Sequence, residues 1–302
     1  MKKKGHSLID KVDSRTHLAL AWEKVKQNHG SAGIDAVTIT EFEADKEVSR
    51  ERLHRELRDG PYQPQPVKRV ERAKSEGGGR KLGIPAIIDR VCQQALVQRL
   101  EPIFEPQLQA CSFGYRKGRS PHEAMRSVWQ GLKAGYGWCV DADLRAFFDT
   151  IPQTTVVDLI AEELSDGRVL QLIGAMVRAG AMQGAYGEPT VTGVPQGAVV
   201  SPLWSHIFLT PFDRAMTAAG YRLTRGADDF VVWCQTRDEA QRALACAKRF
   251  LREELGVTLH PQKTRIVPVS HGFEFLGYTV KQGKGLRLAA QKRRSRSNPH
   301  NL

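Results

Sequence analysis

The stretch that decides the fold is residues 223–234, Leu-Thr-Arg-Gly-Ala-Asp-Asp-Phe-Val-Val-Trp-Cys. Two runs of strand-forming residues flank a short turn in it, a pattern that predicts a β-hairpin. The turn carries two adjacent acids, Asp228 and Asp229, and a strongly apolar run follows them directly. An Asp-Asp pair in an ordinary turn is merely solvated, but this pair stands where a buried strand meets its turn. We therefore predict that the hairpin presents both carboxylates at the end of a sheet.

A second short strand, predicted over residues 138–144, carries two more acids, Asp141 and Asp143. Carboxylates that converge from separate strands can hold a pair of Mg²⁺ ions about 4 Å apart. One such ion activates an attacking 3′-hydroxyl group, and the other neutralises the leaving pyrophosphate. The two acidic strands together indicate a two-metal site for nucleotidyl transfer.

The rest of the chain predicts an α+β domain with a small antiparallel sheet backed by helices. The first third has helical spacing, apart from a Pro-rich and then basic segment at 61–82 that is typical of an exposed hairpin or loop. Ser120 followed by Pro121 and Glu123 predicts a helix start, and Thr236 is expected to cap a helix over 238–255. Further segments are predicted from their spacing, namely helices at 154–164 and 168–179 and extended pieces at 264–269 and 273–280.

The charge of the chain indicates a polyanionic partner. Its 302 residues carry a net charge of +12 with a pI near 9.6, and neutralising phosphates releases counterions. Residues 281–302 hold seven basic and no acidic side chains, although such a tail can also be a solubilising end. No apolar run is long enough to span a bilayer. The five scattered cysteines favour a reducing compartment, and we expect a cytoplasmic protein.

Further sequence blocks stand in order along the chain, on both sides of the acids. They are Asn28–Asp35, Tyr62–Val70 with Gly79–Pro85, Asp89–Leu96, Ser112–Arg116, Asp141–Asp149, Gly193–Gly197 with Ser201-Pro202, Ala227–Asp229, Leu259–Thr264 and Phe273–Tyr278. In this order they resemble the reverse transcriptases of the bacterial group II intron type, collinearly over about residues 30–280.

The resemblance implies the fingers and palm of a right-hand polymerase and an RNA-directed DNA polymerase activity. It places an N-terminal extension and the fingers in residues 1–137. The palm is then residues 138–280, with a return to the fingers side around 180–205. Residues 281–302 are left as a basic C-terminal tail.

By the same resemblance, Asp143, Asp228 and Asp229 are the metal ligands and catalytic acids, with Mg²⁺ as the expected ion and Mn²⁺ as an alternative. Asp141 is expected to be structural. Lys263 matches a residue that donates a proton to pyrophosphate or only contacts its phosphates.

Four residues match nucleotide-binding positions. Lys74 and Arg80 are expected to clamp the incoming triphosphate, although each could be a solvated charge. Phe148 matches the ring that crowds the sugar 2′-carbon and so favours deoxynucleotides; its alternative is a core aromatic. Gln196 is expected to touch the incoming nucleotide or the template base.

Three basic residues, Arg116, Lys117 and Arg119, are candidates for contact with the template backbone, the alternative being an exposed loop. The implied partners are an RNA template, a DNA or RNA primer and dNTPs. An intron RNA, or another protein that supplies a thumb, could join them.

Two departures from the family pattern stand out. Gly226 occupies a position where members usually have Tyr beside the primer end, so we expect weakened or less processive synthesis. Only 22 residues follow Val280, too few for a three-helix thumb, as in a truncated copy. The alternative functions are therefore a degenerate relative that acts as an RNA-binding or assembly factor, and a defence-type polymerase with unusual priming.

Overall fold

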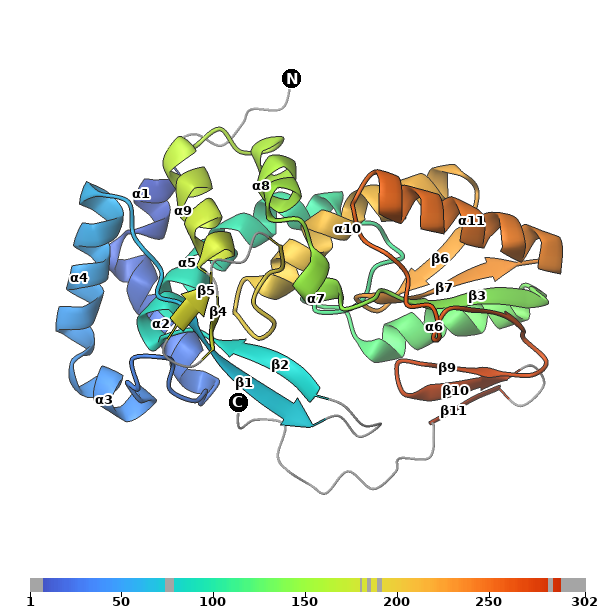
Figure 1. Ribbon diagram of the computed structural model, residues 1–302, viewed down its shortest axis with the longest axis horizontal. Helices are drawn as coiled ribbons and strands as arrows, with labels where there is room; N and C mark the ends of the chain where they lie inside the picture. Colours follow the sequence, from blue (N-terminus) through green and yellow to red (C-terminus); the bar gives the residue numbers. More distant parts are fainter. Residues whose placement is uncertain are drawn as a thin grey trace. The chain divides into compact units, whose positions relative to one another are not determined.

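The computed structural model describes most of the chain, and its contacts divide these residues into two compact units (Figure 1). The described residues are 8–73, 79–179, 181–183, 186–188, 192–281 and 285–288. The first unit holds residues 8–106 and 151–204, and the second holds 107–150 and the described residues from 205 on. The predicted mixed helix and strand class is confirmed. The predicted boundary between fingers and palm at 137/138 stays a prediction. Within the described residues, the chain passes from one compact unit to the other after residues 106, 150 and 204.

Helices make up most of the first unit. They are α1 (Ile9–Val12), α2 (Arg15–Gln27), α3 (Ile39–Ala44), α4 (Lys46–Asp59), α5 (Ile87–Phe104), α8 (Gln153–Ala161) and α9 (Gly167–Arg178). Side-chain caps start several of them: the Ser14 hydroxyl accepts from the His17 N–H, and Thr38 and Glu41 form a capping box. Helix α5 is buried on nearly all sides, with Val91, Leu96 and Leu100 fully covered.

A four-stranded sheet completes the first unit in the order β2-β1-β4-β5. Its strands are β1 (Val67–Ala73), β2 (Gly79–Ile84), β4 (Ala181–Gln183) and β5 (Tyr186–Glu188). Of the hairpin or loop predicted for 61–82, the antiparallel pairing of β1 with β2 supports the hairpin. Strand β4 runs parallel to β1 at Val67 and Lys68, a pairing between segments distant in the sequence.

The second unit contains α6 (Pro121–Lys133), α7 (Phe147–Thr150), most of α10 (Ser201–Ala218) and α11 (Arg237–Glu253). A short 3₁₀ turn, η1 (Glu105–Gln107), lies where the chain first passes from one unit to the other. The predicted capping box of Ser120 and Glu123 is confirmed, as is the Thr236 cap, whose hydroxyl accepts from the Glu239 N–H at 3.1 Å. In the described residues, no helix is both long and apolar enough to cross a bilayer.

The sheet at the centre of this unit is antiparallel throughout, in the order β6-β7-β3-β8. It contains β3 (Trp138–Asp143), β6 (Arg222–Arg225), β7 (Asp229–Cys234) and β8 (Arg265–Pro268). The pairing of β6 with β7 confirms the predicted hairpin.

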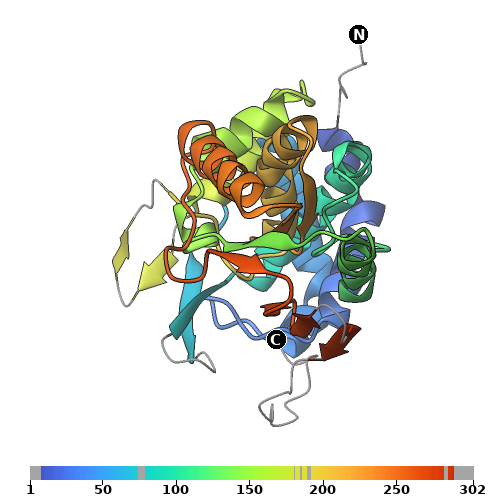
Figure 2. The same ribbon diagram turned by 90° about the vertical axis from the view of Figure 1, so that its right-hand side faces the viewer.

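Side chains that alternate along β7 bury both faces of this sheet. On one face Phe230 lies 5.1 Å from Phe212 of α10, between ring centroids, and α11 covers the same face. On the other face Trp233 packs edge-on against Phe273 at 6.0 Å, together with Met125 and Val128 of α6. Figures 1 and 2 show these helices on opposite sides of the sheet.

A third sheet has the order β11-β10-β9 and corrects one expectation. Residues 273–280 were predicted as one extended piece, but they form the hairpin of β9 (Phe273–Phe275) and β10 (Tyr278–Lys281). Leu276 and Gly277 turn the chain there with φ of 48° and 79°, the backbone of a two-residue hairpin loop. Strand β11 (Gly285–Leu288) falls within the predicted basic tail, so part of that tail is a strand.

A fully buried ion pair joins α10 to the end of β6. The side chains of Arg225 and Asp213 have no exposed surface, and Arg225 Nε donates to Asp213 Oδ1 at 2.7 Å. Two further bonds from the same guanidinium reach the Ala227 carbonyl at 2.8 Å and Ser112 Oγ at 2.9 Å. Burial acts to lower the pKa of Arg225, but the Asp213 carboxylate outweighs it and the pKa is raised. The arginine therefore stays charged and fixes the turn that begins after it.

Loss of one partner of this pair should be costly. Asp213→Asn leaves a buried guanidinium without its counter-charge, so we expect the free energy of unfolding to fall by about 3–5 kcal/mol. Urea unfolding measures this, with Asp158→Asn on the exposed side of α8 as the matched control, expected to change stability by about 0.5 kcal/mol or less. Equal stability of the two variants would contradict a structural role for the pair.

Candidate active site

The structure brings the three predicted metal ligands together at the end of the central sheet of the second unit. Asp143 on β3 stands directly opposite Asp229 on β7 in the antiparallel register, a position that holds two Cα atoms about 4.5–5.5 Å apart. Asp228 precedes Asp229, and its carbonyl oxygen accepts a hydrogen bond from the Leu144 N–H at 3.2 Å. The turn and the end of β3 are thus tied through the backbone.

Crowding of negative charge shows in the pKa of Asp229. This pKa is raised to about 7, chiefly by burial and then by the nearby carboxylates of Asp141, Asp143 and Asp228, while Lys263 lowers it slightly. Repulsion of this kind is what a bound cation relieves.

Asp141 has a partner of its own. Its carboxylate is buried and accepts a hydrogen bond from Arg265 of β8 at 2.8 Å. Burial raises its pKa, although Arg265 opposes the effect. This contact supports the expectation that Asp141 is structural.

Lys263 forms an ion pair with one of the acids, Asp143. Its ammonium nitrogen is 2.9 Å from Asp143 Oδ2, and its side chain is about half exposed (53%). The loop that carries Lys263 is fastened to the end of β3, because the His260 N–H donates to the Asp143 carbonyl at 2.7 Å and the Arg145 N–H donates to the Thr258 carbonyl at 2.9 Å. The sheet end therefore holds four carboxylates and two partly exposed cations, Lys263 and Arg265.

The residues fit a divalent cation that takes oxygen ligands. In the described residues, no three His, Cys, Asp or Glu side chains are arranged as a complete metal cage. Mg²⁺ rarely has such a cage, since it is usually held by one or two carboxylates together with substrate phosphates and water. Asp143 and Asp229, opposite each other with Asp228 beside them, offer that kind of donor set.

Four other predicted residues lie in the same unit. Phe148 on α7 is buried and packs edge-on against Phe147 at 5.2 Å between ring centroids. Arg116 is also buried, and its guanidinium donates to the carbonyls of Gln109 and Ser112, both at 2.8 Å. Lys117 is exposed, and Arg119 lies over the Phe113 ring at 5.3 Å. Arg116 thus braces its own loop, and contact of these three residues with a template stays a prediction.

The remaining predicted residues belong to the first unit. Gln196 is half-buried, and its carbonyl accepts a hydrogen bond from the Gly83 N–H of β2 at 2.8 Å. This bond ties the Pro-Gln-Gly loop to the base of the β1–β2 hairpin. Lys74 and the Arg80 side chain lie outside the described residues, so their predicted contacts with a triphosphate stay predictions.

Leu276 fills the space beside Gly226. A Cβ atom at Gly226 would lie 2.5 Å from Leu276 Cδ2 and 3.3 Å from Leu276 Cγ. Leu276 sits in the turn between β9 and β10 and packs against the core of the unit. Gly226, which departs from the family pattern, therefore lies against Leu276, and the leucine side chain occupies the space that a larger residue at position 226 would need.

Sequence reasoning missed the polar network beneath the acidic turn. Besides Arg225 and Asp213, it contains Ser112 and His206, whose Nδ1 lies 3.4 Å from Ser112 Oγ. The pKa of His206 is lowered to about 3, chiefly by burial and then by the charges of Arg225 and Arg116. The sequence does show polar residues inside otherwise apolar segments. Such a pattern does not indicate which of these residues contact one another in the fold.

The sequence matches the reverse transcriptase (RNA-dependent DNA polymerase) family over residues 72–280. It is 32% identical over 288 residues to protein YkfC of Escherichia coli (strain K12), covering 82% of this chain and 75% of YkfC. It is 29% identical over 283 residues to the group II intron-encoded protein LtrA of Lactococcus lactis subsp. cremoris, covering 89% of this chain and 47% of LtrA. The chain thus spans about half the length of LtrA.

Two solved telomerase structures share the fold. The telomerase of Candida albicans, in complex with a fragment of telomeric RNA, has a TM-score of 0.55 and 12% identity, covering 74% of this chain and 45% of that chain. The apo telomerase of Candida tropicalis also has a TM-score of 0.55, with 15% identity and coverage of 74% and 54%. At such identities the similarity concerns the fold, and it confirms the predicted polymerase architecture.

The contact between Gly226 and Leu276 predicts coupled substitutions. Gly226→Ala places its Cβ against Leu276, so we expect the free energy of unfolding to fall by about 1–3 kcal/mol through overpacking. In a Leu276→Ala background most of that cost should vanish, because the new methyl group enters vacated space. Urea unfolding of the four proteins gives the coupling energy, and an equal cost in both backgrounds would disprove the contact.

The buried His206 predicts an acid-sensitive stability. Because its folded pKa of about 3 lies below the ordinary histidine value of 6.5, the unfolded chain binds the proton first, and stability falls as pH drops below about 6.5. Between pH 7 and pH 5 the wild type should lose about 2 kcal/mol more than His206→Gln. Unfolding at several pH values checks this. His122→Gln, at an exposed position, should keep the wild-type slope.

Proposed function

The chain belongs to the reverse transcriptase family, with relatives of the group II intron type, and on this premise we propose that it extends a primer along an RNA template with deoxynucleotides. The observation that carries the proposal is the Asp143–Asp229 pair at the end of a buried sheet, with Asp228 beside it and Lys263 on Asp143. The family match over residues 72–280 favours this reading over a degenerate RNA-binding or assembly factor.

We assign the metal-holding role to Asp143, Asp228 and Asp229. Two Mg²⁺ ions held there, with Mn²⁺ as an alternative, would supply activation of the primer 3′-hydroxyl group and charge neutralisation at the leaving pyrophosphate. Asp141 is not needed as a ligand, because Arg265 already engages it. Lys263, exposed and positioned on Asp143, would contact the pyrophosphate as it leaves.

We assign substrate contacts to the residues that match the substrate-binding positions of the family. Phe148 would exclude the ribose 2′-hydroxyl group, and Gln196 would contact the incoming nucleotide or its template base. Lys74 and Arg80 would hold the triphosphate. Lys117 and Arg119 would follow the template backbone, while Arg116 braces their loop.

The proposed partners are an RNA template, a DNA or RNA primer and dNTPs. An intron RNA, or a protein that supplies a thumb, is a further candidate partner, since LtrA is a group II intron-encoded protein. We place the activity in the cytoplasm, because all five cysteines are free thiols, as expected of a reducing compartment.

Primer extension on an RNA template tests the activity. With Mg²⁺ and dNTPs the wild type should incorporate nucleotides, whereas Asp228→Ala and Asp143→Asn should lower the rate at least about 100-fold, since each removes charge stabilisation at the reacting phosphates. Removal of Mg²⁺ by a chelator should abolish incorporation.

Asp158→Ala, at an exposed position of α8, is the matched control and should incorporate at the wild-type rate. Incorporation that persists in Asp228→Ala would refute the assigned site. A wild type that binds RNA and never incorporates would favour the RNA-binding alternative.

A further inference from the structure

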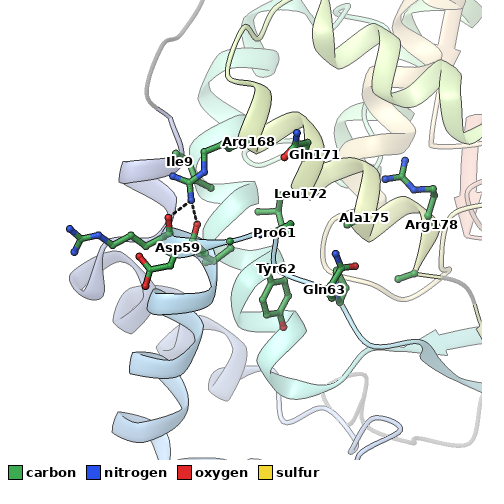
Figure 3. Close-up of a pocket in the computed structure, with 15 residues that line it drawn as sticks. Ile9, Asp59, Pro61, Tyr62, Gln63, Arg168, Gln171, Leu172, Ala175 and Arg178 are labelled. Atoms are coloured by element: carbon green, nitrogen blue, oxygen red, sulfur yellow. Dashed lines mark hydrogen bonds between the residues drawn. The ribbon is translucent and has the colours of Figure 1, made fainter.

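A hollow of about 640 Å³ in the first unit lies between the end of α4 and one side of α9 (Figure 3). Arg168 of α9 donates there to the carbonyls of Leu57 and Arg58, the latter at 2.6 Å, which are carbonyls that the last turn of a helix leaves open. Because the lining holds Asp59 beside its arginines, it selects no single class of ligand. The second unit carries a feature that does.

Tyr115 is an aromatic residue that the fold leaves open to solvent. It is 64% exposed, against 38% for Trp129, the other exposed aromatic residue among those described. The Trp129 ring has an internal partner, since the Lys133 ammonium lies over it at 5.5 Å. Within the described part of the chain, no ring or cation lies against Tyr115. A single exposed ring is ordinary on a protein surface, but the backbone that carries this one is not.

The backbone of Tyr115 lies in the left-handed region, with φ of 56°. A bulky residue there is an outlier, because its Cβ atom crowds the following carbonyl group. Such strain persists only where the surrounding contacts fix it. Here the Arg116 guanidinium donates to the carbonyls of Gln109 and Ser112, both at 2.8 Å, and so closes the loop. The loop therefore holds an exposed aromatic residue in a conformation that costs free energy.

The loop that carries Tyr115 lies along the β6 edge of the central sheet. Ser112 forms a parallel bridge with Arg225, the last residue of β6. The Phe113 N–H donates to the Arg225 carbonyl at 2.9 Å, and the Arg225 N–H donates to the Cys111 carbonyl at 2.8 Å. These contacts place the loop directly beside the start of the acidic turn.

Gly114 brings the loop into contact with the turn itself. A Cβ atom at Gly114 would lie 1.4 Å from the Gly226 carbonyl oxygen and 3.2 Å from the Ala227 nitrogen, so only glycine allows this approach. Consecutive Cα atoms are about 3.8 Å apart. Tyr115 therefore stands one residue from the backbone that presents the two acids of the turn.

The composition of the loop suits a nucleic acid, and its position selects the primer strand. Residues 111–120 hold three basic side chains and no acidic one, and cations beside an aromatic ring are typical of surfaces that bind single strands. In the proposed reaction the metal ions activate the primer 3′-hydroxyl group, so the primer end lies at the acidic turn. Gly226 offers no side chain to that end, and Tyr115 is the aromatic residue next to it.

We infer that the Tyr115 ring packs against the sugar of the primer's terminal nucleotide and holds that nucleotide beside the acidic site. A tyrosine ring offers a large apolar surface with only two torsions to fix, and a braced backbone lowers the cost of ordering it further. The loop thereby supplies an aromatic contact that Gly226 cannot make. The inference rests on the proposed function, because its ligand is a primer end.

The first test observes the primer end without dNTPs. A DNA primer with 2-aminopurine as its 3′-terminal nucleotide is annealed to an RNA template and saturated with protein. The wild type should lower the fluorescence, because a terminal nucleotide that is held in place stays stacked. Tyr115→Asn should remove at least about half of that decrease, whereas Tyr115→Phe keeps the ring and should retain it.

Three controls accompany this test. Trp129→Leu removes an exposed aromatic residue of the same unit and should retain the wild-type decrease. Asn enters the left-handed region more readily than Tyr, so Tyr115→Asn should be at least as stable in urea as the wild type. With 2-aminopurine at the first unpaired template base, the wild type and Tyr115→Asn should respond equally. A dependence on Tyr115 at that base alone would overturn the inference.

The second test is primer extension at varied primer–template concentration. Tyr115→Asn should raise KM at least about fivefold, as expected for loss of a partly buried apolar contact, and change kcat by less than about twofold. Tyr115→Phe should behave as the wild type. Unchanged KM together with unchanged fluorescence in Tyr115→Asn would overturn the inference while leaving the polymerase activity intact. A wild type that shows the Tyr115-dependent fluorescence but never incorporates a nucleotide would refute the proposed function and support the primer contact.

Discussion

The buried pair of Arg225 and Asp213 is the contact on which the acidic site depends. One guanidinium bonds to the Asp213 carboxylate, the Ala227 carbonyl and the Ser112 hydroxyl, so it joins α10, the acidic turn and the segment before α6. A buried pair of this kind adds little net stability compared with apolar residues of the same size. Its contribution is positional: the backbone that presents Asp228 and Asp229 cannot move without breaking charged hydrogen bonds of a fully buried side chain.

The charges at the end of the sheet follow from the same arrangement. Asp141 is engaged by Arg265, Asp143 by Lys263, and Asp228 interacts electrostatically with Arg225. The charge of Asp229 is offset less. Lys263 lowers the pKa of Asp229, but its effect is smaller than those of burial and of the three neighbouring carboxylates, which raise it. The sheet therefore carries an incompletely compensated negative charge at the point where two strands end, as a cation site requires.

Local sequence signals predicted much of this structure. The hairpin at Gly226, the caps at Ser120 and Thr236 and the convergence of Asp143 with Asp228 and Asp229 all follow from short patterns. Contacts between distant segments did not follow, as in the parallel pairing of β4 with β1. The turn at Leu276 was missed because a leucine with positive φ breaks the usual preference for glycine or asparagine.

The way the chain divides between the units has a consequence for synthesis on the ribosome. The chain passes from one unit to the other after residues 106, 150 and 204, so neither unit is a continuous segment. Strand β3 lies between β7 and β8, and both of these neighbours are made later. Domains generally fold as units during translation, yet here the first unit must wait for α9 and the Pro-Gln-Gly loop, and β3 must wait for strands nearer the C-terminus. The nascent protein therefore carries β3 as an unpaired strand until β7 has been made, which makes protection by a chaperone valuable while the chain emerges.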